Sequence, residues 1–188
     1  MIIRKIFYFN NAHIVRNCSS DRCKYSLHAH TYKVEVLFEG YKLDNGGMIY
    51  DFGLMKSSIK NVIKSFDKTI TIWDRDKKLL KLLNNFERYI ILPFSPSAEQ
   101  YAILFYYLIE NILKATKFKN GEGNICLYSV KVHETVTGYA ETTRCDVGNI
   151  DIDKIYFSKT IDKKWFKKLK RAIKSKKYFK NPKVKRQI

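Results

Sequence analysis

The amino-acid sequence predicts an α+β domain with an antiparallel sheet, and two hydrophobic patterns support this prediction. Alternating β-branched and aromatic residues mark extended segments, and apolar residues at helical spacing mark two helices between them. Two pairs of strands separated by helices are typical of α+β domains. The chain has 188 residues, of which 45% are hydrophobic, so it is long enough to fold around one core without disulfides.

The expected strands lie near the two ends of this domain. They cover residues 3–10, 31–40, 125–134 and 139–146. A turn with two glycines at 44–47 follows the second strand, and a glycine-containing turn at 121–124 precedes the third. The chain therefore predicts one strand pair before the helices and one after them.

Two helices are expected between the strand pairs. The first covers about 53–66, with Asp51 as its predicted N-cap. The second covers about 97–116, and the sequence Pro96-Ser97-Ala98-Glu99 gives its start signal. Residues 67–94 show no clear period, so we expect them to be irregular or weakly helical.

The C-terminal part of the chain is strongly basic. Residues 162–188 hold 13 basic residues and one acid, so +12 of the formal net charge of +18 lies there. Within an extension of the 1–149 domain, covering 150–188, residues near 162–178 predict a basic amphipathic helix. Its narrow apolar stripe consists of Trp165, Phe166, Leu169, Ala172 and Ile173. Either this stripe packs on the core, or the charge binds RNA or another polyanion.

Composition also limits the class of protein. No apolar run approaches the roughly 20 residues that a membrane span requires, and the N-terminus has no signal-peptide pattern. Four cysteines in a chain of this length do not suggest a disulfide framework. A cytoplasmic location is therefore expected.

Three of the four histidines predict a metal site. His13, His28 and His30 have the spacing H-x14-H-x-H. Residues two apart on a strand point to the same face, so the rings of His28 and His30 can reach one ion, and His13 ends the neighbouring strand. Three imidazoles leave the fourth tetrahedral position of Zn²⁺ open, as in catalytic rather than structural sites. The sequence thus predicts a catalytic zinc centre.

Other reactive side chains lie near these histidines or at the end of a strand. Cys23 lies in the polar loop between the first two strands, and a thiol close to a metal ion or cation can act as nucleophile or general base. Cys18 and Cys23 could instead be metal ligands, but together with three histidines they would overfill the site. Glu134 ends the third strand on its apolar face, where a carboxylate needs a partner; an exposed strand-end glutamate is the alternative.

These motifs together resemble one family, the 6-pyruvoyl-tetrahydropterin synthases and the bacterial 6-carboxy-tetrahydropterin synthases of queuosine synthesis. The resemblance covers about residues 9–142 in family order and is closest to the queuosine branch. The motifs that carry it are Phe9…Ala12-His13, Cys23, His28-Ala29-His30-Thr31-Tyr32, Gly47-Met48-Ile49-Tyr50-Asp51-Phe52, Pro96-Ser97-Ala98-Glu99 and His133-Glu134-Thr135.

The resemblance implies a reaction and a set of roles. The substrate would be 7,8-dihydroneopterin triphosphate, with Zn²⁺ held by the three histidines and acting as a Lewis acid. Cys23 would be the general base, and Asp67 would belong to the Cys-Asp-His triad of the family. Glu134, with Ser97 and Thr135 beside it, would bind the pterin ring.

One departure from the family pattern concerns catalysis directly. Lys68 follows Asp67 where the family has the triad histidine. An ammonium group is a poor proton acceptor at neutral pH, unless burial close to a cation makes it a usable acid or base. The alternatives are therefore an active 6-carboxy-tetrahydropterin synthase with Lys68 in the triad, an impaired homologue that binds a pterin, RNA or another polyanion, and a 6-pyruvoyl-tetrahydropterin synthase.

The resemblance also implies the tunnelling fold and an assembly. This fold has a four-stranded antiparallel sheet with two helices on one face, in the order β-β-α-α-β-β. In the family, such sheets join edge to edge into trimers, and two trimers stack into a hexamer. The site then lies between subunits, so Glu134 would be able to serve the metal of a neighbouring chain.

Overall fold

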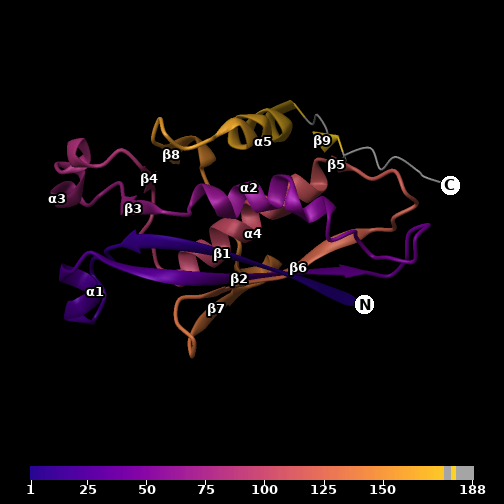
Figure 1. Ribbon diagram of the computed structural model, residues 1–188, viewed down its shortest axis with the longest axis horizontal. Helices are drawn as coiled ribbons and strands as arrows, with labels where there is room; N and C mark the ends of the chain where they lie inside the picture. The colour runs from indigo at the N-terminus through magenta and orange to yellow at the C-terminus, as the bar shows by residue number, and fades with distance from the viewer. Residues whose placement is uncertain (176–178, 181–188) are drawn as a thin grey trace.

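The computed structural model describes residues 1–175 and 179–180, and its main feature is a seven-stranded mixed sheet (Figure 1). The strand order in this sheet is β7-β6-β2-β1-β3-β4-β8. The strands are β1 (Ile2–His13), β2 (His28–Gly40), β3 (Thr69–Trp73), β4 (Tyr89–Leu92), β6 (Ile125–His133), β7 (Tyr139–Thr142) and β8 (Tyr156–Phe157). A separate two-stranded sheet pairs β5 (Thr116–Lys117) with β9 (Phe179–Lys180).

Four of the seven strands form the antiparallel unit that the sequence predicts. β1 pairs with β2, β2 with β6, and β6 with β7, all antiparallel. The β1–β2 register places His13 directly opposite His28 and Asn11 opposite His30. The four predicted strands and the α+β class are therefore confirmed, although the sheet contains more strands than four.

The expectation that residues 67–94 are irregular or weakly helical is wrong in part. This segment contains β3 and β4, which extend the sheet in parallel from β1, together with α3 (Lys77–Leu80) and the 3₁₀ turn Leu83–Asn85. Both strands have no more than five residues, too few for a period of two to emerge clearly. Tertiary pairing with β1, rather than local pattern, fixes them as strands.

Helices cover one face of the sheet. α2 (Ser58–Ser65) and α4 (Ala98–Lys114) pack against it, as Figure 1 shows, whereas the short α1 (Asp21–Tyr25) lies at the end of β1 and β2. Ser97 is the N-cap of α4 and its hydroxyl accepts a hydrogen bond from the Gln100 amide. The N-cap prediction for Asp51 is wrong: its carboxylate accepts from the Gly53 amide, and a 3₁₀ turn, Leu54–Lys56, precedes α2.

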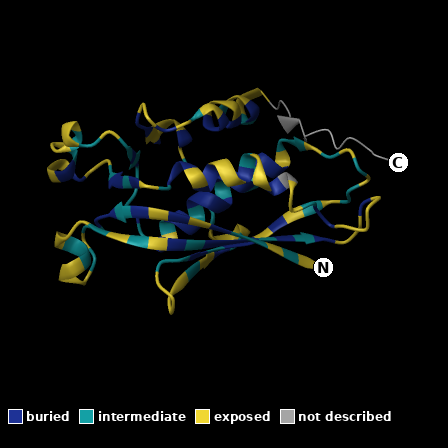
Figure 2. Ribbon diagram, viewed as in Figure 1, coloured by how far each residue is buried: buried dark blue, intermediate teal, exposed yellow. Residues whose placement is uncertain are grey.

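The core lies between the sheet and these helices, where Figure 2 shows buried residues on the facing sides. Alternate residues of β1, β2 and β6 point into it, as the pairs Val34–Val36 and Val130–Val132 illustrate. The same alternation that buries Phe9 also buries Asn11 and His13. The hydrophobic pattern of the strands therefore determines which face receives the histidines.

The basic helix of the extension packs on the body of the protein. α5 (Lys164–Ser175) buries Trp165, Phe166, Leu169 and Ala172 against the main core, and the Trp165 indole donates to the Ser65 hydroxyl of α2. The reading in which the apolar stripe packs on the core is thus the one the structure supports. Residues 176–178 and 181–188 of the predicted basic tail lie outside the described residues, and the domain boundary near 149 stays a prediction. None of the described helices is long and apolar enough to span a bilayer.

Candidate functional site

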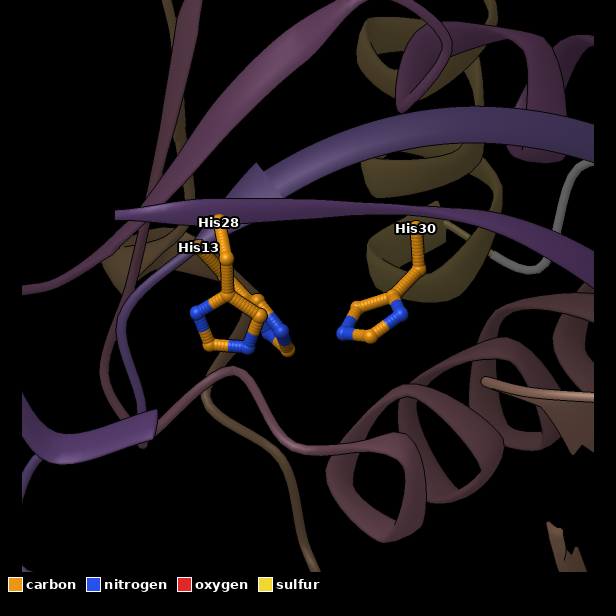
Figure 3. Close-up of side chains that lie close together, drawn as sticks. All are labelled: His13, His28 and His30. Atoms are coloured by element: carbon orange, nitrogen blue, oxygen red, sulfur yellow. The ribbon is translucent and has the colours of Figure 1, made fainter. Parts of the chain in front are cut away.

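The three predicted histidines come together at one end of the β1–β2 strand pair. His13 is the last residue of β1, and His28 and His30 occupy the first and third positions of β2. Their rings point to the same side, as Figure 3 shows, and one ligand atom from each lies within 4.8 Å of the others. In the described part of the chain, this is the group of three or more potential ligands that fits a metal ion. Strand register thus produces the cluster that the spacing predicts.

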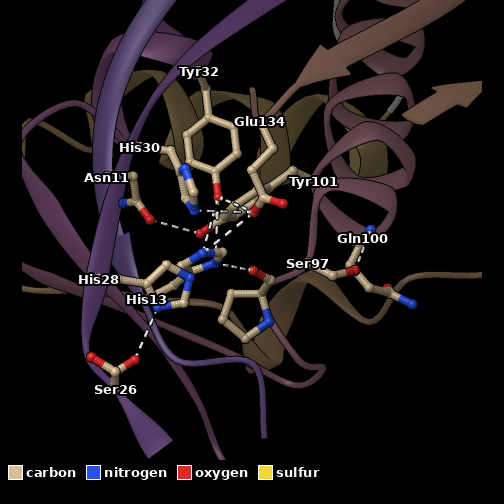
Figure 4. A network of polar contacts seen from close by, with 11 residues as sticks. Asn11, His13, Ser26, His28, His30, Tyr32, Ser97, Gln100, Tyr101 and Glu134 are labelled. Carbon is tan, nitrogen blue, oxygen red and sulfur yellow. Dashed lines mark hydrogen bonds and ion pairs between the residues drawn. The ribbon is translucent and has the colours of Figure 1, made fainter. Parts of the chain in front are cut away.

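Main-chain carbonyls determine which nitrogen of two rings faces the centre. Nδ1 of His13 is hydrogen-bonded to the Pro96 carbonyl, and Nδ1 of His28 to the Ser26 carbonyl at 2.9 Å (Figure 4). A carbonyl only accepts, so Nδ1 donates its proton in both rings and Nε2 keeps its lone pair. This is the tautomer that metal-bound histidines adopt. Burial is the main cause that lowers the pKa of His13, so this ring is neutral at pH 7.

Glu134 lies beside the three-histidine cluster. Its Oε1 is 3.4 Å from Nε2 of His13 and 3.7 Å from Nε2 of His30, and the Tyr32 hydroxyl donates to it at 3.0 Å (Figure 4). Burial is the main cause that raises the pKa of Tyr32, so its phenol stays protonated and remains a donor. Glu134 therefore belongs to the site of its own chain, whereas the resemblance allows it to serve a neighbour.

These residues fit a divalent cation. One nitrogen from each of the three histidines lies within 4.8 Å of the others, and the Glu134 carboxylate lies beside His13 and His30, so several electron-pair donors are close together. Such groups repel one another unless a proton or a metal ion lies between them. Three imidazole nitrogens suit zinc and other first-row transition metals better than Mg²⁺ or Ca²⁺, which prefer oxygen. A metal bound here would be held by the three histidines, with the Glu134 carboxylate nearby.

Two aromatic residues that were not predicted as site residues, Tyr32 and Tyr101, pack against the His13 ring. Tyr32 follows His28 and His30 at the next i+2 position of β2, which is the signal that could have identified it. Tyr101 of α4 is fully buried, stacks with the His13 ring at a centroid distance of 6.5 Å and donates to the Asn11 side chain at 2.7 Å. The Asn11 amide in turn donates to Thr69 of β3. These hydrogen bonds connect α4, β1 and β3 next to the histidine cluster.

Cys23 lies in α1, at the same end of the sheet as the histidines. The Cys23 carbonyl accepts a hydrogen bond from the Val15 amide at 3.1 Å, two residues beyond His13. Its side chain is half-buried and is one of the groups whose electrostatic effect raises the pKa of Tyr32. Cys18 lies outside the helix, where its thiol donates to the Ser20 carbonyl. The structure therefore brings Cys23, and not a Cys18–Cys23 pair, towards the cluster.

The two remaining residues predicted to bind substrate flank the site with their hydroxyls engaged in local structure. Ser97 caps α4 directly after Pro96, whose carbonyl holds His13. Thr135 follows Glu134, and its hydroxyl accepts from the Gly138 amide in the turn between β6 and β7. Both residues thus stabilise segments that carry site groups, and direct contact with a substrate stays a prediction.

Asp67 and Lys68 lie on the other side of the sheet. Oδ1 of Asp67 accepts from the Asn10 amide at 2.8 Å, and the Lys68 amide donates to the Asn10 carbonyl at 2.7 Å. Lys68 is exposed and lines a cavity of about 490 Å³ together with Ala12 and Ala29. These alanines alternate with the histidines along β1 and β2, so their side chains point to the opposite face. One chain alone therefore does not place Lys68 in the histidine cluster.

The backbone at Lys68 is unusual. Its φ of 54° lies in the left-handed region, which costs a residue other than glycine roughly 1–2 kcal/mol. The conformation ends the turn after α2 and points the chain into β3.

Two side chains on the opposite face agree with the strand alternation expected from the sequence. His133 approaches Glu35 at 3.0 Å and packs beside Tyr139, away from Glu134. Ala29 is exposed, and its Cβ points away from the histidines. The fourth histidine therefore does not supplement the cluster.

Known proteins are similar to this chain in sequence and in fold. A family model described as 6-pyruvoyl tetrahydropterin synthase matches residues 2–145. Proteins from two Helicobacter pylori strains, both named 6-carboxy-5,6,7,8-tetrahydropterin synthase, are 42% identical over 151 residues, covering 79% of this chain and 76% of theirs.

Solved structures agree with these sequence matches at the level of the fold. An uncharacterized protein from Wolinella succinogenes superposes with a TM-score of 0.64 at 18% identity, covering 77% of this chain and 98% of its own. The Caenorhabditis elegans 6-pyruvoyl tetrahydropterin synthase gives 0.52 at 21% identity, covering 76% and 94%. The sheet and helices are thus those of the tunnelling fold, and the chain belongs to the 6-pyruvoyl tetrahydropterin synthase family.

Proposed function

We propose that this protein is a zinc-dependent 6-carboxy-5,6,7,8-tetrahydropterin synthase that converts 7,8-dihydroneopterin triphosphate in queuosine biosynthesis. The names of the Helicobacter pylori relatives support the choice of reaction. The observation that carries the proposal is the convergence of His13, His28 and His30 beside Glu134, because it combines an open metal site with a carboxylate for ligand binding.

The residues around the three histidines have separate tasks in this proposal. When bound, zinc would supply Lewis-acid polarisation of the side-chain oxygens of the substrate, which acidifies the neighbouring C–H bond. Glu134 uses Oε1 to accept from Tyr32 and turns its second oxygen towards the ligand, where it accepts from the N–H edge of the pterin. The protonated Tyr32 holds that carboxylate in place.

Proton transfer is assigned to Cys23, with Asp67 and Lys68 from a second copy of the chain. Cys23 approaches from α1, whereas Asp67 and Lys68 face the opposite side of the sheet, so an assembly is required to combine them. We propose the homohexamer implied by the family, a dimer of trimers located in the cytoplasm. The outer strands β7 and β8 provide edges at which sheets of neighbouring subunits can pair.

The proposal is tested by incubating purified, zinc-loaded protein with 7,8-dihydroneopterin triphosphate and separating the pterin products. We expect triphosphate, acetaldehyde and the 6-carboxy product, and a Lys68→His variant is assayed in parallel. Lack of turnover by both proteins despite bound zinc would overturn the proposal.

The other outcomes separate the remaining alternatives. Turnover by Lys68→His but not by the wild type would show an intact site that the lysine has impaired. A 6-pyruvoyl product would instead assign the protein to the other branch of the family.

A further inference from the structure

The helix that carries Cys23 is not held by hydrophobic packing. α1 has five residues, none of them buried, and its N-cap residue Ser20 makes no side-chain capping hydrogen bond. A helix of this length is unstable in isolation, because the first turn costs more conformational entropy than its few hydrogen bonds return. Polar contacts to neighbouring elements must therefore determine where Cys23 lies.

Three such contacts tie α1 to the segment just after β1 and to the start of β2. The Val15 amide donates to the Cys23 carbonyl at 3.1 Å, and Nη1 of Arg16 donates to the Lys24 carbonyl at 2.8 Å. Directly after the helix, the carbonyl of its C-cap residue Ser26 accepts from the His28 ring. The Arg16 contact is the one made by a long side chain, so its strength depends on what holds the guanidinium.

Asp76 holds that guanidinium from a third element. Its Oδ2 accepts from Nε of Arg16 at 2.8 Å and its Oδ1 lies 3.4 Å from Nη2, which makes a two-point contact. Only 5% of the Asp76 side chain and 22% of the Arg16 side chain are exposed. Oδ1 also accepts from the Leu79 amide as the N-cap of α3, so the carboxylate is itself fixed in position.

We propose that Arg16, locked by Asp76, is a positioning residue that holds the Cys23 helix against the three-histidine cluster. The planar guanidinium serves both contacts at once: its Nε–Nη2 edge binds the carboxylate while Nη1 reaches the helix. The segment after β3 thereby sets the location of the thiol. The value of this position for catalysis rests on the proposed function, in which Cys23 is the general base.

Hydrogen–deuterium exchange of the full-length, zinc-loaded protein tests the structural half of the inference. In Arg16→Ala, exchange of the amides in 20–26 is expected to rise about tenfold or more, the factor expected when a charge-assisted hydrogen bond is lost. Exchange in β1 and β2 is expected to stay unchanged. Arg4→Ala is the matched control, because Arg4, like Arg16, binds a mostly buried carboxylate, but it lies in β1 and its partner Glu35 is on the other face.

A second variant keeps the test valid if Arg16→Ala fails to fold. Arg16→Lys retains a charge for Asp76, but a single ammonium cannot also span to the Lys24 carbonyl. It is expected to fold like the wild type and still to show faster exchange in 20–26. Unchanged exchange in a folded Arg16 variant would overturn the inference.

Steady-state kinetics test the catalytic half. Arg16→Lys is expected to lower kcat per bound zinc about tenfold with KM within about twofold, because the thiol is misplaced while Glu134 and the histidines remain. Faster exchange without a change in kcat would overturn the positioning role. If the wild type does not turn over 7,8-dihydroneopterin triphosphate, the proposed function fails, whereas the exchange data still decide whether Arg16 holds the helix.

Discussion

The three-histidine cluster and the Asp67–Lys68 turn lie on opposite faces of the same strands, and they differ in how completely one chain builds them. The cluster has its ligands, the two carbonyls that orient His13 and His28, and the carboxylate of Glu134 within a single chain. Asp67 and Lys68 instead contact Asn10 and line a separate cavity. One chain thus supplies all three histidines of the candidate metal site, whereas the proposed proton transfer depends on assembly.

Removing a ligand of the cluster gives the largest expected effect. His13→Ala removes a buried imidazole, so zinc binding and turnover should be lost. The fall in zinc affinity should exceed the roughly 10–100-fold caused by mutating residues that only hydrogen-bond to the metal ligands. Metal content per chain, measured by elemental analysis, checks this. His133→Ala removes the histidine of the opposite face and should retain both zinc and activity; equal loss in the two variants would contradict the comparison.

Glu134→Gln should have the next largest effect. The amide keeps the size of the side chain but loses the negative charge that accepts from the ligand and from Tyr32. We expect kcat/KM to fall by about 100-fold, which corresponds to the loss of charge-assisted hydrogen bonds. Zinc content should not change. Glu141→Gln is the control, since Glu141 of β7 forms an ion pair with Lys131 of β6; a similar loss there would argue against a special role for Glu134.

Lys68→Ala tests whether the opposite face takes part in the reaction. If Lys68 supplies a proton-transfer group across a subunit boundary, kcat should fall at least about tenfold while each chain keeps its zinc. Lys60→Ala on α2 provides a control for the loss of a surface charge. Full activity in Lys68→Ala would restrict catalysis to the histidine face.

The smallest expected effect on activity is that of Glu35→Gln, on the same face as His133. Burial acts to raise the pKa of Glu35, but hydrogen bonds from Lys33 and Arg4 outweigh it and lower the pKa to about 2. An unfolded glutamate titrates near pH 4.3, so between these values the unfolded state binds more protons. Stability from Glu35 is therefore complete above about pH 4.3 and is lost as the pH falls towards 2.

Thermal unfolding across this range checks the prediction for Glu35. The melting temperature of the wild type should fall more steeply with decreasing pH than that of Glu35→Gln, whose side chain does not titrate. Turnover of the two proteins at neutral pH should be the same. Parallel slopes would show that the pKa of Glu35 is not lowered in the folded state.

Strand alternation was sufficient to predict that the three histidines share a site, whereas the family resemblance was needed to add Glu134. The i, i+2 spacing of His28 and His30 fixes a face, and Glu134 continues the apolar face of β6. The same rule extends to Tyr32, whose role the sequence reading missed because a tyrosine at that position also suits a core. The sequence alone therefore predicts residues whose place in the site follows from the two-residue alternation of a strand.

Groups that act through the main chain or across long separations were not predictable. The carbonyls of Ser26 and Pro96 orient two rings, yet a carbonyl leaves no signal in residue type. Arg16 and Asp76 are 60 positions apart, and β3 pairs with β1 only in the folded chain. Such contacts depend on topology, which a single sequence does not specify.

X-ray absorption at the zinc edge tests the central claim most directly, because it reports the ligands of the metal in the intact protein. The account predicts a first shell of nitrogen and oxygen at about 2.0–2.1 Å with the multiple scattering of three imidazoles, and without sulfur. This pattern should be lost in His13→Ala and preserved in His133→Ala. A zinc–sulfur distance of about 2.3 Å would contradict the account, since it would make Cys23 or Cys18 a ligand and close the position that the substrate requires.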